Sequence, residues 1–215
     1  MFLGFFYSFV SSLAMKHSSP AENSEIAQSV RLRRQVDEQL ENNYAHAYEI
    51  AKSIKHPWYK CQALSSVAEK SSKASIDSIL EQAFSSAMQC HDQNRRVTVA
   101  CWPLWVAIKN DRTKLISGFL KQCTIQINQE MDPLSKWCVC DVLYRIKAKP
   151  NLLNDFFDTF KNATSKGHGW RIERMIKFLL SDEDIQSDSR YIKHLEGRQR
   201  EIEEWKQNHV HRKVC

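Results

Sequence analysis

The sequence predicts an all-α protein built from helical hairpins, and three observations support this fold class. The 215 residues include only five Gly and five Pro, and the Asn-Gly and Asp-Gly pairs typical of β-hairpins do not occur. Apolar residues recur along most of the chain at the i, i+3, i+4 and i+7 spacing of an amphipathic helix. Prolines and capping residues interrupt this pattern at intervals, so short joints are expected between the helices.

The clearest hairpin lies in residues 47–69. The apolar face of its first helix consists of Ala47, Ile50, Ala51 and Ile54. The second helix repeats that spacing with Ala63, Leu64, Val67 and Ala68. Pro57 suits the first turn of the second helix, because the amide hydrogen it lacks would have no partner there. Since one hairpin cannot bury both of its faces alone, neighbouring hairpins are expected.

The same plan recurs downstream. Further helices are expected to begin near the start signals Ser75, Asn94, Asp132-Pro133 and Pro150. Pro103 falls inside one of these helices, where a kink is expected. The second helices of successive hairpins can be superposed through the basic residues near their starts, which are Lys60, Arg96, Lys136 and Arg171. These residues are separated by 36, 40 and 35 positions.

With this period and apolar spacing, residues 45–180 resemble the HEAT-like superfamily of α-α repeat proteins. Tetratricopeptide-type repeats are the near alternative, although their pattern of Trp, Gly, Tyr and Pro at fixed offsets is not reproduced. The resemblance implies a right-handed α-α solenoid of about four helical hairpins, with an N-terminal helix and a charged C-terminal helix. It also implies that the concave face binds another macromolecule.

Three segments are expected along the chain. Residues 1–24 form an apolar N-terminal segment plus a linker, residues 25–185 form the helical repeat domain, and residues 186–215 form a charged helix or cap. The apolar run 2–14 is shorter than the ~20 residues that span a bilayer as a helix. It is interpreted as a signal or anchor, as a docked helix, or as sequence upstream of a true start at Met15.

The polar stretch 182–189 is expected to form a loop. The charged helix beyond it is interpreted either as the polar cap that a terminal repeat needs or as a partner-binding helix.

The sequence contains no pattern that predicts catalysis or a cofactor. The seven cysteines are expected to be mostly reduced core residues, because buried cysteine behaves as a small apolar residue. Cys138 and Cys140 should therefore pack in the core. The adjacent trio Cys90-His91-Asp92 is expected to be exposed at a helix end. The C-terminal residues His209, His211 and Cys215 lack an evident fourth metal ligand, so no metal is expected.

Aromatic and basic residues gather at the starts of the second helices. The candidate partner-binding residues are Trp58, Lys60, Arg95, Arg96, Lys136, Trp137, Trp170 and Arg171. The tryptophans are interpreted either as a hydrophobic staple at each hairpin corner or as a ridge of interface hot spots. The predicted function is that of a non-catalytic protein-interaction module or scaffold in the cytoplasm.

Two other functions remain open from the sequence. The formal charge of +6 is spread along the chain, which permits a nucleic-acid-binding repeat that uses the same basic edge. The other alternative is an exported or membrane-tethered protein in which residues 2–14 act as the signal or anchor.

Overall fold

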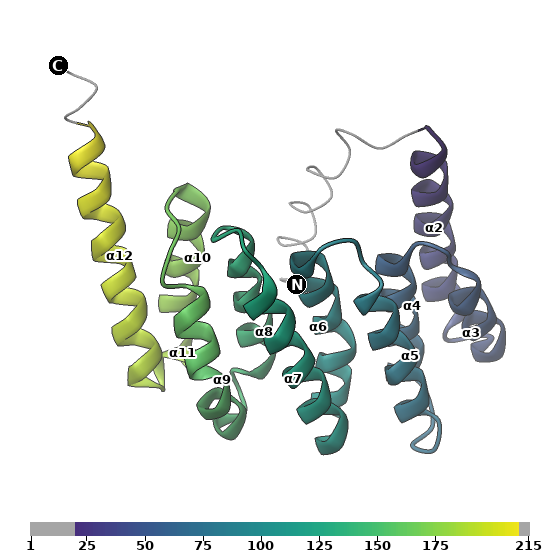
Figure 1. The fold of residues 1–215 in the computed structure, drawn as a ribbon. Helices are drawn as coiled ribbons and strands as arrows, with labels where there is room; N and C mark the ends of the chain where they lie inside the picture. Colours follow the sequence, from purple (N-terminus) through teal and green to yellow (C-terminus); the bar gives the residue numbers. More distant parts are fainter. Residues whose placement is uncertain (1–19, 211–215) are drawn as a thin grey trace. The chain divides into compact units, whose positions relative to one another are not determined.

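The computed structural model describes residues 20–210, and every regular element in that range is a helix. The all-α fold class is therefore confirmed over these residues. The apolar run 2–14 lies outside them. The helices, in chain order, are α2 (Pro20–Gln39), α3 (Tyr44–Ser53), α4 (Pro57–Glu69), α5 (Ile76–Met88), α6 (Gln93–Lys109), α7 (Thr113–Gln129), the 3-10 helix η1 (Ser135–Cys138), α8 (Val139–Ile146), α9 (Pro150–Ala163), α10 (Trp170–Leu180), α11 (Glu183–Gln186) and α12 (Ser189–Val210) (Figure 1).

The chain divides into two compact units, one ending at Ser86 and the other beginning at Ala87. This boundary falls inside the expected repeat domain 25–185, near the end of α5. Among residues 20–210, no helix combines the length and the apolar composition needed to cross a bilayer.

The N-terminal unit contains the predicted first hairpin. Helix α3 packs against α4, and α2 packs against both. Pro57 is the first residue of α4, and His56 before it has an extended backbone, as the proline rule requires. Ala47, Ala51 and Leu64 are fully buried. The hairpin of residues 47–69 is therefore confirmed.

The expected linker before this hairpin is wrong in part. Helix α2 already begins at Pro20, whereas a linker was expected through residue 24. Proline is well suited to the first turn of a helix, because its fixed φ is helical and its missing amide hydrogen is not needed there. Pro20, which was expected to belong to the linker, is thus the first residue of a helix.

The C-terminal unit is a row of helices that lie in chain order from α6 to α12 (Figure 1). Helix α6 packs on α7 and α8, α8 packs on α9, and α10 packs on α12. Most contacts therefore join elements that are close in sequence.

The predicted helix starts in this unit are only partly correct. Pro150 is the first residue of α9, as predicted. Helix α6 is capped by Asp92 rather than Asn94, because the Asp92 carboxylate accepts the Arg95 N–H at 2.8 Å. The helix continues through Pro103 to its end. The Asp132 carboxylate accepts the N–H of Ser135, the first residue of the 3-10 helix η1, at 3.1 Å.

The loop expected at residues 182–189 is wrong in part, because residues 183–186 form the helix α11 and α12 begins at Ser189. Asp182 caps the short helix α11, and Ile185 within it is fully buried. Helix α12 buries a stripe of apolar residues, and the hydroxyl of Tyr191 in that stripe donates to the Leu153 carbonyl at 2.9 Å. These contacts favour the cap interpretation of the charged C-terminal helix.

The six cysteines within the described residues are all buried and unbridged, as predicted. The expectation of an exposed Cys90-His91-Asp92 trio is wrong for Cys90, which is only 3 % exposed, whereas His91 is exposed and Asp92 is half-buried. Burial raises the pKa of the Cys90 thiol to about 11. The cysteine that the sequence placed at a surface turn is therefore an inert core residue.

Candidate functional site

The eight candidate residues are divided between the two units. Trp58 and Lys60 are half-buried in the first turn of α4, in the N-terminal unit. The other six belong to the C-terminal unit. The sequence repeat suggested that Lys60, Arg96, Lys136 and Arg171 are equivalent, but Lys60 belongs to a different unit from the other three.

Arg95 and Arg96 are occupied by interactions within the protein. The Nε of Arg96 donates to the Cys90 carbonyl at 2.8 Å, and one terminal nitrogen donates to the Gln126 side chain at 3.0 Å. Arg95 pairs with the capping residue Asp92 at 3.4 Å. These arginines therefore hold the start of α6, and a charge reversal at Arg96 would disturb the fold.

The tryptophans at the helix starts differ from one another. Trp137 is 2 % exposed, and its indole N–H donates to the Lys166 carbonyl at 3.1 Å. Trp170 is 59 % exposed, with the guanidinium of Arg171 5.4 Å from its ring centre. The ridge interpretation therefore fails at Trp137, which is a structural anchor beside the half-buried Lys136.

An open hollow of about 570 Å³ lies in this part of the C-terminal unit. Three segments form it: the turn before η1, the loop of residues 164–169 between α9 and α10 (here the α9–α10 loop), and α12. The residues that line it are Pro133, Leu134, Ser165, Lys166, Gly167, His168, Gly169, Arg198 and Trp205. None of these nine was singled out from the sequence as a candidate.

Side chains from two neighbouring elements hold the α9–α10 loop. Trp137 from η1 binds the Lys166 carbonyl, and Arg198 from α12 donates to the next carbonyl, that of Gly167, at 2.8 Å. At the start of the loop, the Thr164 hydroxyl and the His194 Nε2 lie 2.8 Å apart. The loop is thus joined to α12 at two points and to η1 at one.

Arg198 has the least usual environment in the hollow. Its side chain is only 5 % exposed, and its guanidinium pairs with Glu201, whose own side chain is 59 % exposed. The Nε of Arg198 has no hydrogen-bond partner. Burial, together with the charges of Arg198 and Lys161, lowers the pKa of the neighbouring His194. The hollow is therefore lined by a buried cation, Arg198, whose Nε donor is without a partner.

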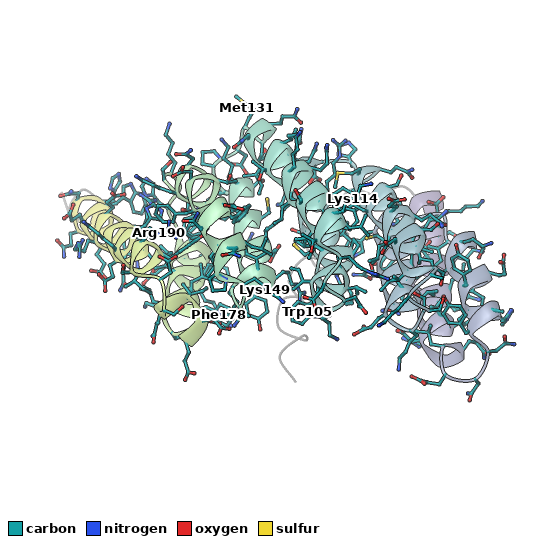
Figure 2. All side chains as sticks on the ribbon, turned by 90° about the horizontal axis from the view of Figure 1, so that it is seen from below. Trp105, Lys114, Met131, Lys149, Phe178 and Arg190 are labelled. Atoms are coloured by element: carbon teal, nitrogen blue, oxygen red, sulfur yellow. The ribbon has the colours of Figure 1, made fainter. Side chains whose placement is uncertain are left out.

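A stack of three rings lies at the hollow, and two of its members, His168 and Trp205, belong to the lining. The rings of His168 and Trp205 are 5.0 Å apart and nearly parallel, and His209 stacks on Trp205 at 4.4 Å. Trp205 is 37 % exposed and Leu134 is 56 % exposed. Met131, which is 87 % exposed, projects from the ribbon beyond the end of α7 (Figure 2). The rim is therefore rich in exposed aromatic and apolar surface.

The hollow offers no evident metal site. Across residues 20–210, no group of three or more His, Cys, Asp or Glu side chains is arranged to hold a metal ion. Of the C-terminal residues considered as ligands, His209 contacts Trp205, whereas His211 and Cys215 lie outside the described residues.

No protein-family model, no curated protein and no solved structure matches this chain. The resemblance to HEAT-like repeats therefore rests on the sequence period and on the row of helices. One signal near the hollow is visible in the sequence: Gly167 and Gly169 follow the helical pattern that starts at Pro150, and glycine is typical of the end of a helix. Arg198 and Trp205 gave none, because a charged amphipathic helix such as α12 does not reveal which of its residues faces a loop.

Proposed function

We propose that this protein is a non-catalytic interaction module that binds another protein through the rim of the hollow. It is built, in this proposal, as a right-handed α-α solenoid of helical hairpins. The packing of each helix in the C-terminal unit on its near neighbours in sequence supports that architecture. The buried, unbridged thiols suit a reducing compartment, which supports a cytoplasmic location.

One observation carries the proposal: large exposed apolar side chains line one hollow, and others follow or precede its lining in the sequence. Leu134 and Trp205 line it, while Met131 and Trp170 lie within two positions of a lining residue in the sequence. Exposed apolar surface gathered in one place marks interaction sites more often than isolated exposed residues do. Tryptophan is also among the residues enriched at the energetic centres of protein interfaces.

Nucleic acid is the less favoured partner. Its binding requires basic side chains that reach successive phosphates. Arg95 and Arg96 belong to the basic edge that this alternative needs, but they are engaged with Asp92, Cys90 and Gln126. The exposed surface around the hollow is mainly apolar instead.

The test compares two tryptophans of equal exposure. Trp105 and Trp205 are each 37 % exposed, and Trp105 lies at the opposite edge of the C-terminal unit from Met131 (Figure 2). Affinity capture with mass spectrometry identifies a partner of the wild-type protein, and titration of the purified partner then measures its affinity. Trp205→Ala is expected to weaken that affinity by about tenfold or more, as at an interface hot spot.

The control variant Trp105→Ala should retain the wild-type affinity. Circular dichroism and thermal melting confirm that both variants are folded. If Trp205→Ala binds as tightly as the wild-type protein, the rim of the hollow is not the binding surface.

A further inference from the structure

The hollow has the charge of an anion site. Lys166 and Arg198 line it, and its nine lining residues include no Asp or Glu. Gly169, which precedes the first residue of helix α10, belongs to the same lining, and no side chain caps this helix start. The N-terminus of a helix carries a partial positive charge and presents backbone N–H groups, which favours anions.

Arg198 supplies a second, independent indication of a ligand. A guanidinium has five N–H donors. In Arg198 one terminal nitrogen binds the Gly167 carbonyl, the other pairs with Glu201, and Nε is without a hydrogen-bond partner. A buried cation with an unused donor is costly unless another acceptor arrives. Since Glu201 is largely exposed, its carboxylate can turn into solvent and leave Arg198 to an incoming anion.

We propose that this hollow binds a phosphate monoester on a side chain of the partner protein. Lys166 and Arg198 contact the phosphate oxygens, while Leu134 and Trp205 contact the apolar atoms beside it. The inference rests on the proposed function, because it specifies the chemistry of the same surface. A phosphate group suits the site because it has several acceptor oxygens and a charge of about −1.5 to −2 near neutral pH.

A phosphorylated protein segment fits the hollow better than a nucleic acid does. The cationic groups converge on one place, and exposed apolar side chains border it. Single-stranded nucleic acids instead need a groove of positive charge that follows the backbone over several nucleotides. A protein segment that carries one phosphate next to apolar atoms therefore matches this lining better than a chain of nucleotides does.

The first experiment tests the anion site without any partner. The full-length protein, labelled with nitrogen-15, is titrated with phenyl phosphate, and the indole N–H signals are followed by NMR. The Trp205 signal is assigned with Trp205→Phe. The expected result is a saturable shift of the Trp205 signal with phenyl phosphate and a far smaller response to phenol, which has the ring without the phosphate. The absence of a saturable shift at millimolar phenyl phosphate overturns the proposal.

Substitutions of the cationic lining residues and of Glu201 should change the affinity for phenyl phosphate in opposite directions. Lys166→Gln and Arg198→Lys should each weaken phenyl phosphate binding several-fold, whereas Glu201→Gln should strengthen it, because a competing carboxylate is removed. Lys121→Gln and Glu203→Gln make the same changes in net charge at exposed positions outside the lining. If these controls change the affinity as much as the lining variants do, the effect is general electrostatics and the proposal fails. Lys166 is exposed, so its variant remains informative even if Arg198→Lys is unstable.

A second experiment separates this inference from the proposed function. Partner capture is repeated after phosphatase treatment of the lysate, and phenyl phosphate is displaced with either a phosphotyrosine peptide or oligouridylate. Loss of capture after phosphatase treatment, with displacement by the peptide, supports the proposal. If capture depends on Trp205 but survives phosphatase treatment, the inference is overturned and the proposed function stands. Tighter displacement by oligouridylate overturns the choice of a protein ligand.

Discussion

Replacement of Gly167 by alanine tests whether the α9–α10 loop is as constrained as its contacts indicate. Gly167 has φ +98°, a backbone conformation that L-residues rarely adopt. A Cβ added there would lie 2.7 Å from Cδ1 of Ile172 and 3.4 Å from the indole nitrogen of Trp137. The substitution therefore combines backbone strain with a close contact in the wall of the hollow.

The expected loss of stability follows from these two effects. Positive φ costs a non-glycine residue about 1 to 3 kcal/mol. A contact of 2.7 Å requires the end of the Ile172 side chain to shift, which adds about 1 kcal/mol, at the lower end of the cost of overpacking. The loop cannot relax freely, because its carbonyls are held by Trp137 and Arg198. Gly167→Ala should thus destabilise the protein by about 2 to 4 kcal/mol.

Two other glycines provide matched controls. Gly118 lies within α7, and a Cβ there would meet nothing within 4 Å. Gly118→Ala should therefore stabilise the protein by up to about 1 kcal/mol through helix propensity. Gly169 has φ +123° but an equally open Cβ position, so Gly169→Ala isolates the backbone strain.

The measurement is denaturant unfolding followed by circular dichroism. The expected order of stability is Gly118→Ala, wild type, Gly169→Ala and then Gly167→Ala. If Gly167→Ala unfolds within about 0.5 kcal/mol of the wild type, the usual range for a surface substitution, the loop is not held as described.

Three further predictions concern titration and thiol chemistry. Burial raises the pKa of Asp141 to about 6. Because the folded state then holds the proton more tightly than the unfolded state does, the free energy of unfolding falls as the pH rises from about 4 to 6. Asp141→Asn should therefore gain about 1 to 3 kcal/mol at pH about 8 and little at pH about 3, and equal gains in urea unfolding at both pH values would contradict this. The pKa of His194 is lowered, chiefly by burial, so stability should be lost as the pH falls below about 6.5; thermal melts should show a smaller acid loss in His194→Gln, and an unchanged loss would remove His194 as its cause. Burial raises the pKa of Cys123 to about 12, and the other described thiols are also buried; in Cys215→Ser, iodoacetamide should label none of the remaining cysteines without denaturant, as mass spectrometry would show, and rapid labelling of the native protein would refute their burial.

The sequence-based predictions are most accurate where the structure depends on residues close together in the chain. Pro57 and Pro150 were predicted as helix starts because a proline acts on its own turn and the residue before it. The sequence predicted Asn94 instead of Asp92 as the cap of α6, because Asp and Asn are both residue types that cap helices and the pattern alone does not fix the helix start within two residues. The loop expected at residues 182–189 failed for a related reason: its polar composition concealed the capping residue Asp182 and the single buried Ile185.

The candidate site was the less predictable part. The equivalence of Lys60, Arg96 and Lys136 in the repeat is a statement about position in the chain, and it does not say what each side chain contacts. Arg96 is engaged with a carbonyl and an amide, and Trp137 is buried against a loop that lies almost thirty residues downstream. The hollow itself depends on contacts between residues separated by 31 positions, such as Arg198 and Gly167.

The sequence by itself determined that this protein is helical and where most of its helices lie, because the apolar period and the prolines act through local backbone geometry. It also determined that the cysteines are core residues, because cysteine behaves as a small apolar residue. Only the tertiary structure decided which residues meet around the α9–α10 loop. Arg198 and Trp205 occupy a charged helix whose pattern resembles any solvated surface helix, and their roles arise from the loop and the 3-10 helix that pack beside them. Side-chain contacts between distant segments depend on how the helices pack, and helical periodicity shows which face of a helix packs but not which residues of another segment that face meets.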